Sequence, residues 1–261
     1  MSGGDFGLEV LGCNATAPSA SGPASGYVLH SELGAILVDA GPGTMAAYAA
    51  RYELERVRAI VVTHMHADHS LDLMAWAYRW TFPAARERIP LYLPRGAEQA
   101  LRGFDELYGI PTLPGMHRPI EQSFRVTTLE MDGDTRHELP GWTMISFEAR
   151  HAVPSAALRF ERAGRAVAFS SDTGDCPGVR AAAAGSDLFV CEATWIDEPD
   201  ADSAGHGHLT AAQAGRIALE VGTRSLLVTH LADRSASAEA LRLAAEQFGG
   251  PVRIATAGMR L

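Results

Sequence analysis

The chain has 261 residues, of which 47% are hydrophobic, so it is long enough for one large core or at most two small ones. Its formal net charge is −9, and all 22 basic residues are arginine. This acidic charge balance argues against a protein that binds a long polyanion such as a nucleic acid, because phosphate contacts need clustered basic side chains. The lack of lysine also excludes a Schiff-base mechanism.

The amino terminus, "MSGGDFGLEV", has neither the basic start nor the apolar centre of a secretory signal. No apolar run reaches the roughly 20 residues that a membrane span requires, so we expect a cytoplasmic protein. Cys13, Cys176 and Cys191 are too few and too scattered for a disulfide framework or a CxxC zinc site. We expect these cysteines to be reduced.

Short apolar runs predict β-strands at residues 8–11, 26–30, 35–39, 59–63, 91–93, 142–148, 156–161, 165–170, 188–192, 225–229 and 252–256. Helical patterns lie between several of them, at residues 44–52, 71–80, 97–108, 179–184, 210–221 and 236–248. No linker or charge block divides the chain. We therefore expect a single domain over residues 1–261, with mixed sheets covered by helices. Its prolines make the segment 109–122 the expected irregular excursion.

The segment 60–70, "IVVTHMHADHS", places coordinating side chains directly behind a predicted strand. His64 and His66 are two positions apart, so an extended backbone points both rings the same way. Asp68 and His69 follow at the turn into the next helix, where they can face a second ion. Imidazole and carboxylate are the ligands expected for Zn²⁺ or a similar divalent ion. A polar loop whose histidines cap a helix would explain a lone histidine, but the His-x-His-x-Asp-His spacing favours a metal site.

Three further candidate ligands follow three other predicted strands. His151 comes after "TMISFEAR", Asp172 after "AVAFSS" and His230 after "SLLVT". Each of them taken singly could be a capping or hydrogen-bonded side chain. Together with the segment 60–70 they favour a dinuclear site at the strand ends.

These residues resemble the metallo-β-lactamase superfamily, whose signature is T-H-x-H-x-D-H with later His, Asp and His ligands. The segments "LGCNATAP" and "LVDAGPGT" also look like its early glycine-containing turns, so the resemblance covers essentially the whole chain. It implies an α/β fold, a four-layer αβ/βα sandwich of two mixed β-sheets flanked by helices. It also implies two divalent metal ions, Zn²⁺ with Mn²⁺ as the alternative. The first ion would be held by His64, His66 and His151, the second by Asp68, His69 and His230, and Asp172 would bridge them.

A narrower resemblance concerns catalysis. The segments "SSDTGDC", "CEATW" and "HLTAAQAGRIA" are similar to elements of the ribonuclease Z and phosphodiesterase branch. In that branch Asp68 would orient the attacking nucleophile, and Glu192 would orient His208 as the acid for the leaving oxygen. The alternative makes Glu192 a buried or capping acid and "GHGHLT" a helix start capped by Thr210. His206 is the rival to His208 for the acid role.

One departure bears on the substrate. Ribonuclease Z carries a long arm that clasps tRNA, inserted between the equivalents of His151 and Asp172, whereas here only residues 152–171 separate them. That length allows a β-hairpin and nothing more. With the acidic balance, we expect a small anionic phosphodiester such as a cyclic nucleotide, and neither nucleic acid nor a membrane as a partner.

Other functions and assemblies stay open on sequence grounds. The alternatives are a ribonuclease Z-type tRNA 3′-processing endonuclease and a thioesterase or lactonase that uses the same metals. A non-catalytic binding protein on a hydrolase fold is disfavoured, because every metal position holds a competent ligand. The homodimer remains an alternative to the monomer.

Overall fold

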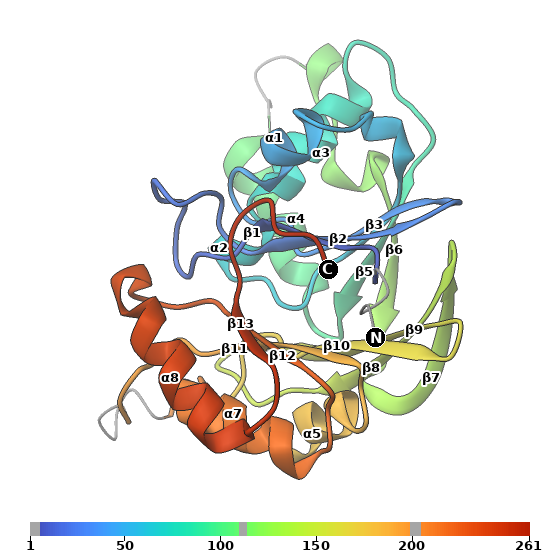
Figure 1. Cartoon of the computed structure of the whole chain (residues 1–261). Helices are drawn as coiled ribbons and strands as arrows, with labels where there is room; N and C mark the ends of the chain where they lie inside the picture. Colours follow the sequence, from blue (N-terminus) through green and yellow to red (C-terminus); the bar gives the residue numbers. More distant parts are fainter. Residues whose placement is uncertain (1–5, 110–113, 199–204) are drawn as a thin grey trace.

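Two β-sheets face each other in the computed structural model, which describes residues 6–109, 114–198 and 205–261 (Figure 1). The first sheet contains, in spatial order, β1 (Leu8–Gly12), β2 (Gly26–Ser31), β3 (Gly34–Val38), β4 (Val57–Val61), β5 (Ile89–Pro94) and β6 (Phe124–Leu129). The second contains β13 (Val252–Ile254), β12 (Leu226–Thr229), β11 (Leu188–Glu192), β10 (Arg165–Phe169), β9 (Ala156–Arg162), β8 (Trp142–Glu148) and β7 (Asp132–Leu139).

Each sheet begins as an antiparallel meander and ends in parallel strands. In the first sheet β1, β2 and β3 are antiparallel, and the pairs from β3 to β6 are parallel. In the second, β7 to β10 are antiparallel and β10 to β13 are parallel. Parallel strands bring their carboxyl ends to one edge of a sheet. The segments that follow β4, β10, β11 and β12 therefore share an edge of the sandwich.

Helices cover the outer face of each sheet (Figure 1). The first sheet carries α1 (Thr44–Ala49), α3 (Asp72–Thr81) and α4 (Glu98–Tyr108), and the second carries α5 (Pro177–Ala183), α7 (Ala211–Glu220) and α8 (Ser237–Phe248). The short helix α2 (Ala67–Ser70) follows β4, and 3₁₀ helices form at Leu54–Arg56, Pro114–Met116, Ile120–Gln122 and Arg234–Ala236. None of the helices in the described parts of the chain has the length and apolar character needed to cross a bilayer.

Central strands such as β3 and β11 are apolar on both faces, and both of their faces are buried. Ile36 and Val38 of β3 lie in the core between the sheets, whereas Leu37 faces the outer helices. In β11, Val190 faces inward and Phe189 faces α5, α7 and α8. Such two-sided burial gives near-continuous apolar runs rather than alternation. The arrangement confirms the predicted four-layer sandwich.

The start of α7 shows how local sequence sets the chain near the sandwich edge. Thr210 is the N-cap: its hydroxyl accepts the Gln213 backbone N–H at 3.1 Å, and the Gln213 side chain accepts the Thr210 N–H at 2.9 Å. This capping box satisfies two otherwise unpaired donors. The cap at Thr210, which the sequence offered as part of the alternative to a catalytic role for this segment, is therefore present, and it fixes the segment that carries His208.

Two strands were not predicted. β6 and β7 lie at the edges of their sheets. The sequence of β7, "DGDTRHEL", is almost entirely polar because most of its side chains face solvent. Pairing with β8, rather than burial of an apolar face, makes this segment a strand.

Two smaller expectations can be compared with the structure. In the expected irregular segment, residues 110–113 lie outside the described parts, and the remainder includes the 3₁₀ helices at Pro114–Met116 and Ile120–Gln122. Cys13, Cys176 and Cys191 are all free thiols, as expected.

Candidate metal centre

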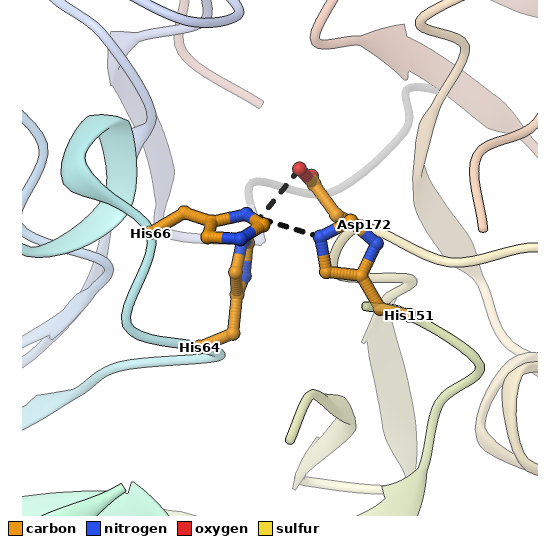
Figure 2. A group of neighbouring side chains, drawn as sticks. All are labelled: His64, His66, His151 and Asp172. Carbon is orange, nitrogen blue, oxygen red and sulfur yellow. Dashed lines mark hydrogen bonds and ion pairs between the residues drawn. The ribbon is translucent and has the colours of Figure 1, made fainter. Parts of the chain in front are cut away.

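A first group of ligand-type side chains comprises His64, His66, His151 and Asp172, which point toward one another in Figure 2. One ligand atom from each lies within 4.8 Å of all the others. His66 Nδ1 is 3.1 Å from His151 Nε2, and His64 Nε2 is 3.6 Å from Asp172 Oδ2. The residues come from the segments after β4, β8 and β10, so both sheets contribute to the group.

A second group comprises Asp68, His69 and His230, with ligand atoms again within 4.8 Å of one another. The Nε2 atoms of His69 and His230 are 3.0 Å apart, and His230 Nε2 is 3.2 Å from Asp68 Oδ2. All three side chains are buried. Helix α2 supplies two of them and the end of β12 supplies the third.

Asp172 lies between the two groups. Its Oδ2 faces His64, whereas its Oδ1 is 3.4 Å from His69 Nε2 and 3.5 Å from His230 Nε2. One carboxylate thus directs one oxygen to each group. This is the geometry that a bridging ligand needs.

In each histidine, the nitrogen that points away from the ligand groups also makes a hydrogen bond. That bond decides which ring nitrogen carries the hydrogen and which is left to bind an ion. His151 Nδ1 is 3.0 Å from the Gly207 carbonyl, and His69 Nδ1 is 2.7 Å from Asp39 Oδ2. Both oxygens only accept, so each Nδ1 carries the hydrogen and donates it. The Nε2 atoms of both rings therefore face the ligand groups, where each would bind an ion through its lone pair once it carries no hydrogen.

Thr194 plays the same part for His230. Its hydroxyl donates to Glu192 Oε2 at 2.7 Å, which leaves the oxygen free to accept from His230 Nδ1 at 3.1 Å. The His230 Nε2 lone pair is then directed at the second group.

His64 provides a test of whether these residues suit a divalent ion. Its Nε2 is buried and has no hydrogen-bond partner within the described residues, while Nδ1 lies 3.2 Å from the Thr63 hydroxyl. A buried polar atom without a partner costs about 1–3 kcal/mol. Burial also lowers the pKa of His64 well below its ordinary value, which keeps the ring neutral. A neutral imidazole with a free buried nitrogen is what a metal ion binds, so the residues fit the group.

The second group concentrates negative charge. Burial alone would lower the pKa of His69, but the carboxylates of Asp172 and Asp39 raise it well above its ordinary value. Burial would likewise raise the pKa of Asp68, yet the neighbouring His230 and His69 hold it below the ordinary value. Asp68 is therefore ionised and attracts positive charge, which a divalent ion supplies.

Glu192 and His208 form a pair beside the two groups. Glu192 is buried, and its Oε1 accepts from the Thr173 N–H at 2.8 Å and from His208 Nδ1 at 3.0 Å. His208 Nδ1 therefore carries its hydrogen, and Nε2 is left for other chemistry. Burial works against the charged form, but the hydrogen bond and charge of Glu192 raise the pKa of His208 above its ordinary value. His206 is exposed and does not contact Glu192, so the pair contains His208.

Four residues of the candidate centre have a strained, left-handed backbone conformation. Thr16, Asp39, Ser171 and His230 have φ angles of 62°, 64°, 58° and 57°. This left-handed region costs an L residue roughly 1–2 kcal/mol. Each of the four lies at the centre; for example, the Thr16 N–H donates to Asp68 Oδ2 at 2.7 Å. The sharp turns aim the residues from strand ends into the sandwich edge.

Sequence reasoning missed three contributors to this geometry. Asp39 orients His69 and accepts from the Thr63 N–H at 2.8 Å; an acid directly behind the apolar run "AILV" was a signal that could have identified it. Thr194 lies in the quoted segment "CEATW" but received no role. Thr16 acts through its backbone N–H, and a backbone group leaves no signal in the sequence.

Comparisons with known proteins identify the family and the fold. The β-lactamase superfamily domain matches residues 35–231. A ribonuclease Z from Streptomyces coelicolor is 30% identical over 287 aligned positions, which cover 95% of this chain and 91% of that protein. The metallo-β-lactamase fold protein YhfI from Bacillus subtilis has a TM-score of 0.82 at 23% identity, with 97% of this chain and 98% of that chain covered. Human short-form tRNase Z has a TM-score of 0.74 at 21% identity, with 97% and 98% covered.

The chain therefore belongs to the β-lactamase superfamily and is a hydrolase with the metallo-β-lactamase fold. Its relatives within the superfamily include proteins named ribonuclease Z, which confirms the predicted resemblance. The fold implies binding of divalent metal ions, in accord with the clustered histidines and aspartates.

Proposed function

We propose that this hydrolase is a phosphodiesterase with a dinuclear metal centre, and that its substrate is a small phosphodiester such as a cyclic nucleotide. The observation that carries the proposal is the position of the His208–Glu192 pair beside Asp172. Polar atoms of these three side chains lie within 4.8 Å of one another. His208, which could protonate a poor leaving group, thus lies close to Asp172, the proposed bridging carboxylate.

The proposed ligand sets follow the two groups. His64, His66 and His151 would hold the first ion, Asp68, His69 and His230 the second, and Asp172 both. When bound, two divalent ions, Zn²⁺ or Mn²⁺, attract an anionic diester and lower the pKa of water to roughly 7. This local charge explains how a protein with a net charge of −9 binds an anion.

The chain's own groups would carry the proton chemistry. Asp68 Oδ2 accepts the Thr16 N–H at 2.7 Å, so its carboxylate is fixed in position to orient the attacking water. His208 would donate a proton from Nε2 to the departing alkoxide. Glu192 keeps Nδ1–H in place and stabilises the imidazolium before transfer. Because His208 would protonate the leaving oxygen, the alkoxide would not have to depart as a strong base.

Three observations support a small substrate. Strands β9 and β10 form a tight hairpin between His151 and Asp172, with only Ala163 and Gly164 between the strands. The match to the Streptomyces ribonuclease Z extends over 287 positions, more than the 261 residues here, so that relative carries insertions. The net charge of −9 opposes a folded RNA.

The name of that relative favours a second candidate, tRNA 3′ processing. The same metal centre could also serve a thioesterase or lactonase. Hydrolysis of a neutral acyl-thioester would also use the metals. Its thiolate leaving group, however, departs without the proton that His208 would supply. The substrate classes therefore differ in their dependence on His208.

One panel tests these functions. The metal-loaded protein is assayed at equal enzyme concentration on bis-p-nitrophenyl phosphate, a 3′,5′-cyclic nucleotide, a tRNA precursor and an acyl-thioester. We expect the two small diesters to be cleaved with the highest kcat/KM. Processing of the tRNA precursor at least as efficient as cleavage of every small diester would establish the second candidate instead. Preference for the acyl-thioester, unchanged in His208→Ala, would establish a thioesterase.

A further inference from the structure

A third group of imidazoles lies beside the proposed dinuclear centre. His151, His206 and His208 each offer a ligand atom, and these atoms lie within 4.8 Å of one another. The His206 ring is nearly parallel to that of His208, at 6° with 6.0 Å between centroids, and its centroid is 5.9 Å from that of His151. His206 is exposed, so the group opens to solvent.

The hydrogen bonds show which nitrogens of this group are available. His151 donates from Nδ1 to Gly207 and directs Nε2 at the first ligand group. His208 uses Nδ1 for Glu192 and keeps Nε2. His206 is exposed and adds its own ligand-type nitrogen to the group. His206 and His208 therefore each offer a nitrogen that is not part of the proposed dinuclear centre.

We propose that His206 and His208 bind a third, exchangeable Zn²⁺ ion that inhibits the hydrolase. Imidazole is a common zinc ligand at about 2.0–2.1 Å. His206 and His208 already offer ligand atoms within 4.8 Å of each other, and His206 is exposed. The hydrogen bond from Nδ1 to Glu192 strengthens His208 as a ligand. Only two side chains hold this ion, compared with the larger ligand sets of the dinuclear centre. The third ion is thus bound more weakly than the other two and exchanges with zinc ions in solution.

The inhibitory effect rests on the proposed function. An ion on His208 Nε2 occupies the lone pair that would carry the proton, so the histidine no longer donates to the leaving group. Excess Zn²⁺ should slow cleavage of a cyclic nucleotide more than cleavage of a nitrophenyl diester, whose phenolate departs without help. Mg²⁺ prefers oxygen ligands and should not have this effect.

The binding test uses the full-length holoprotein with both sites of the dinuclear centre loaded. It is dialysed against buffered Zn²⁺ of rising free concentration, and bound zinc is counted by mass spectrometry. We expect wild type to take up a third equivalent. His206→Ala should keep two and bind the third at least roughly tenfold more weakly, as loss of metal-site contacts commonly does. His117→Ala is the matched control, because His117 lies in none of the ligand groups.

Activity is measured on the same samples, each relative to its own rate at low free zinc. We expect half-inhibition of cyclic-nucleotide cleavage to shift upward at least roughly tenfold in His206→Ala and not in His117→Ala. An equally tight third equivalent in His206→Ala would overturn the proposal, and so would saturation of wild type at two. A wild type that binds three ions but cleaves no diester would refute the proposed function and leave the third binding site standing.

Discussion

The hydrogen-bond partner of Nδ1 determines which chemistry Nε2 of the same histidine can perform. Where that partner is an obligate acceptor, as for His69 and His151, the ring presents a lone pair to the ligand groups. For His208 the same arrangement with Glu192 leaves Nε2 available, and one nitrogen of the ring lies within 4.8 Å of an Asp172 oxygen. Residues outside the ligand groups therefore control the chemistry of residues inside them.

Asp172 gives the first prediction at this scale. Asp172→Ala removes both carboxylate oxygens that lie between the two groups, so the variant should lose at least one of the two ions and nearly all activity. Metal content by mass spectrometry and diesterase assays check this. Asp175→Ala is the control, because Asp175 pairs with Arg180 outside the ligand groups. Full metal content and full activity in Asp172→Ala would rule out the bridging assignment.

Asp39 gives a second prediction. In Asp39→Asn the amide can still accept the Thr63 N–H, but its NH₂ group would face His69 Nδ1–H. The ring would lose its anchor, and zinc affinity at the second group should fall roughly 10–100-fold. Competition with a chromophoric chelator measures the affinity. An affinity within a factor of two of wild type would show that Asp39 does not position His69.

His208 gives a third prediction. If it protonates the leaving group, His208→Ala should retain its metals and lose roughly 10²–10⁴-fold in turnover of a 3′,5′-cyclic nucleotide. The loss on bis-p-nitrophenyl phosphate should be much smaller, and Glu192→Gln should show the same pattern in milder form. Equal losses on both substrates would indicate a binding role. The leaving-group defect in His206→Ala instead of His208→Ala would exchange the two roles.

At the scale of elements, parallel strand ends bring the site together. The segments after β4, β10 and β12 each deliver a ligand at the same edge, and α7 fixes the segment that carries His208. The tight hairpin of β9 and β10 separates the segments that carry His151 and Asp172. The elements thus bring together the residues of the candidate centre.

The N-cap of α7 gives the prediction at this scale. Thr210→Ala removes the hydroxyl that accepts the Gln213 N–H and should lower the free energy of unfolding by about 1 kcal/mol. Thr210→Ser keeps the oxygen and should lose much less. Urea unfolding of the metal-loaded proteins compares the two. Equal stability of the alanine and serine variants would mean that the cap contributes nothing.

At the scale of the whole molecule, we expect metal binding and folding to be coupled. The segment after β4, with α2, carries His64, His66, Asp68 and His69, whereas the second half of the chain carries His151, Asp172 and His230. Ions held by both halves would bind only when the two halves are packed together. Their binding free energy would therefore contribute to the stability of the fold.

Removal of the metals should accordingly lower the melting temperature. A ligand at 100 times its Kd stabilises a protein by about 2.7 kcal/mol, so the chelator-treated protein should melt several degrees below the metal-loaded one. Calorimetry of both forms measures the difference, and added Zn²⁺ should restore it. The same melting temperature with and without metal would contradict a role of the ions in joining the two halves.

The sequence by itself determined the repeated apolar strands, the residue types behind them and the resemblance to the superfamily, because buried strands and clustered ligands leave local patterns. It did not identify the edge strands β6 and β7, and β7 in particular is polar and is stabilised by pairing with its neighbour. Only the tertiary structure decided that Asp172 faces both groups, that Asp39 holds His69, and that His208 rather than His206 meets Glu192. These contacts join residues far apart in the chain, and their distances depend on how the two sheets pack and where the backbone turns at the strand ends.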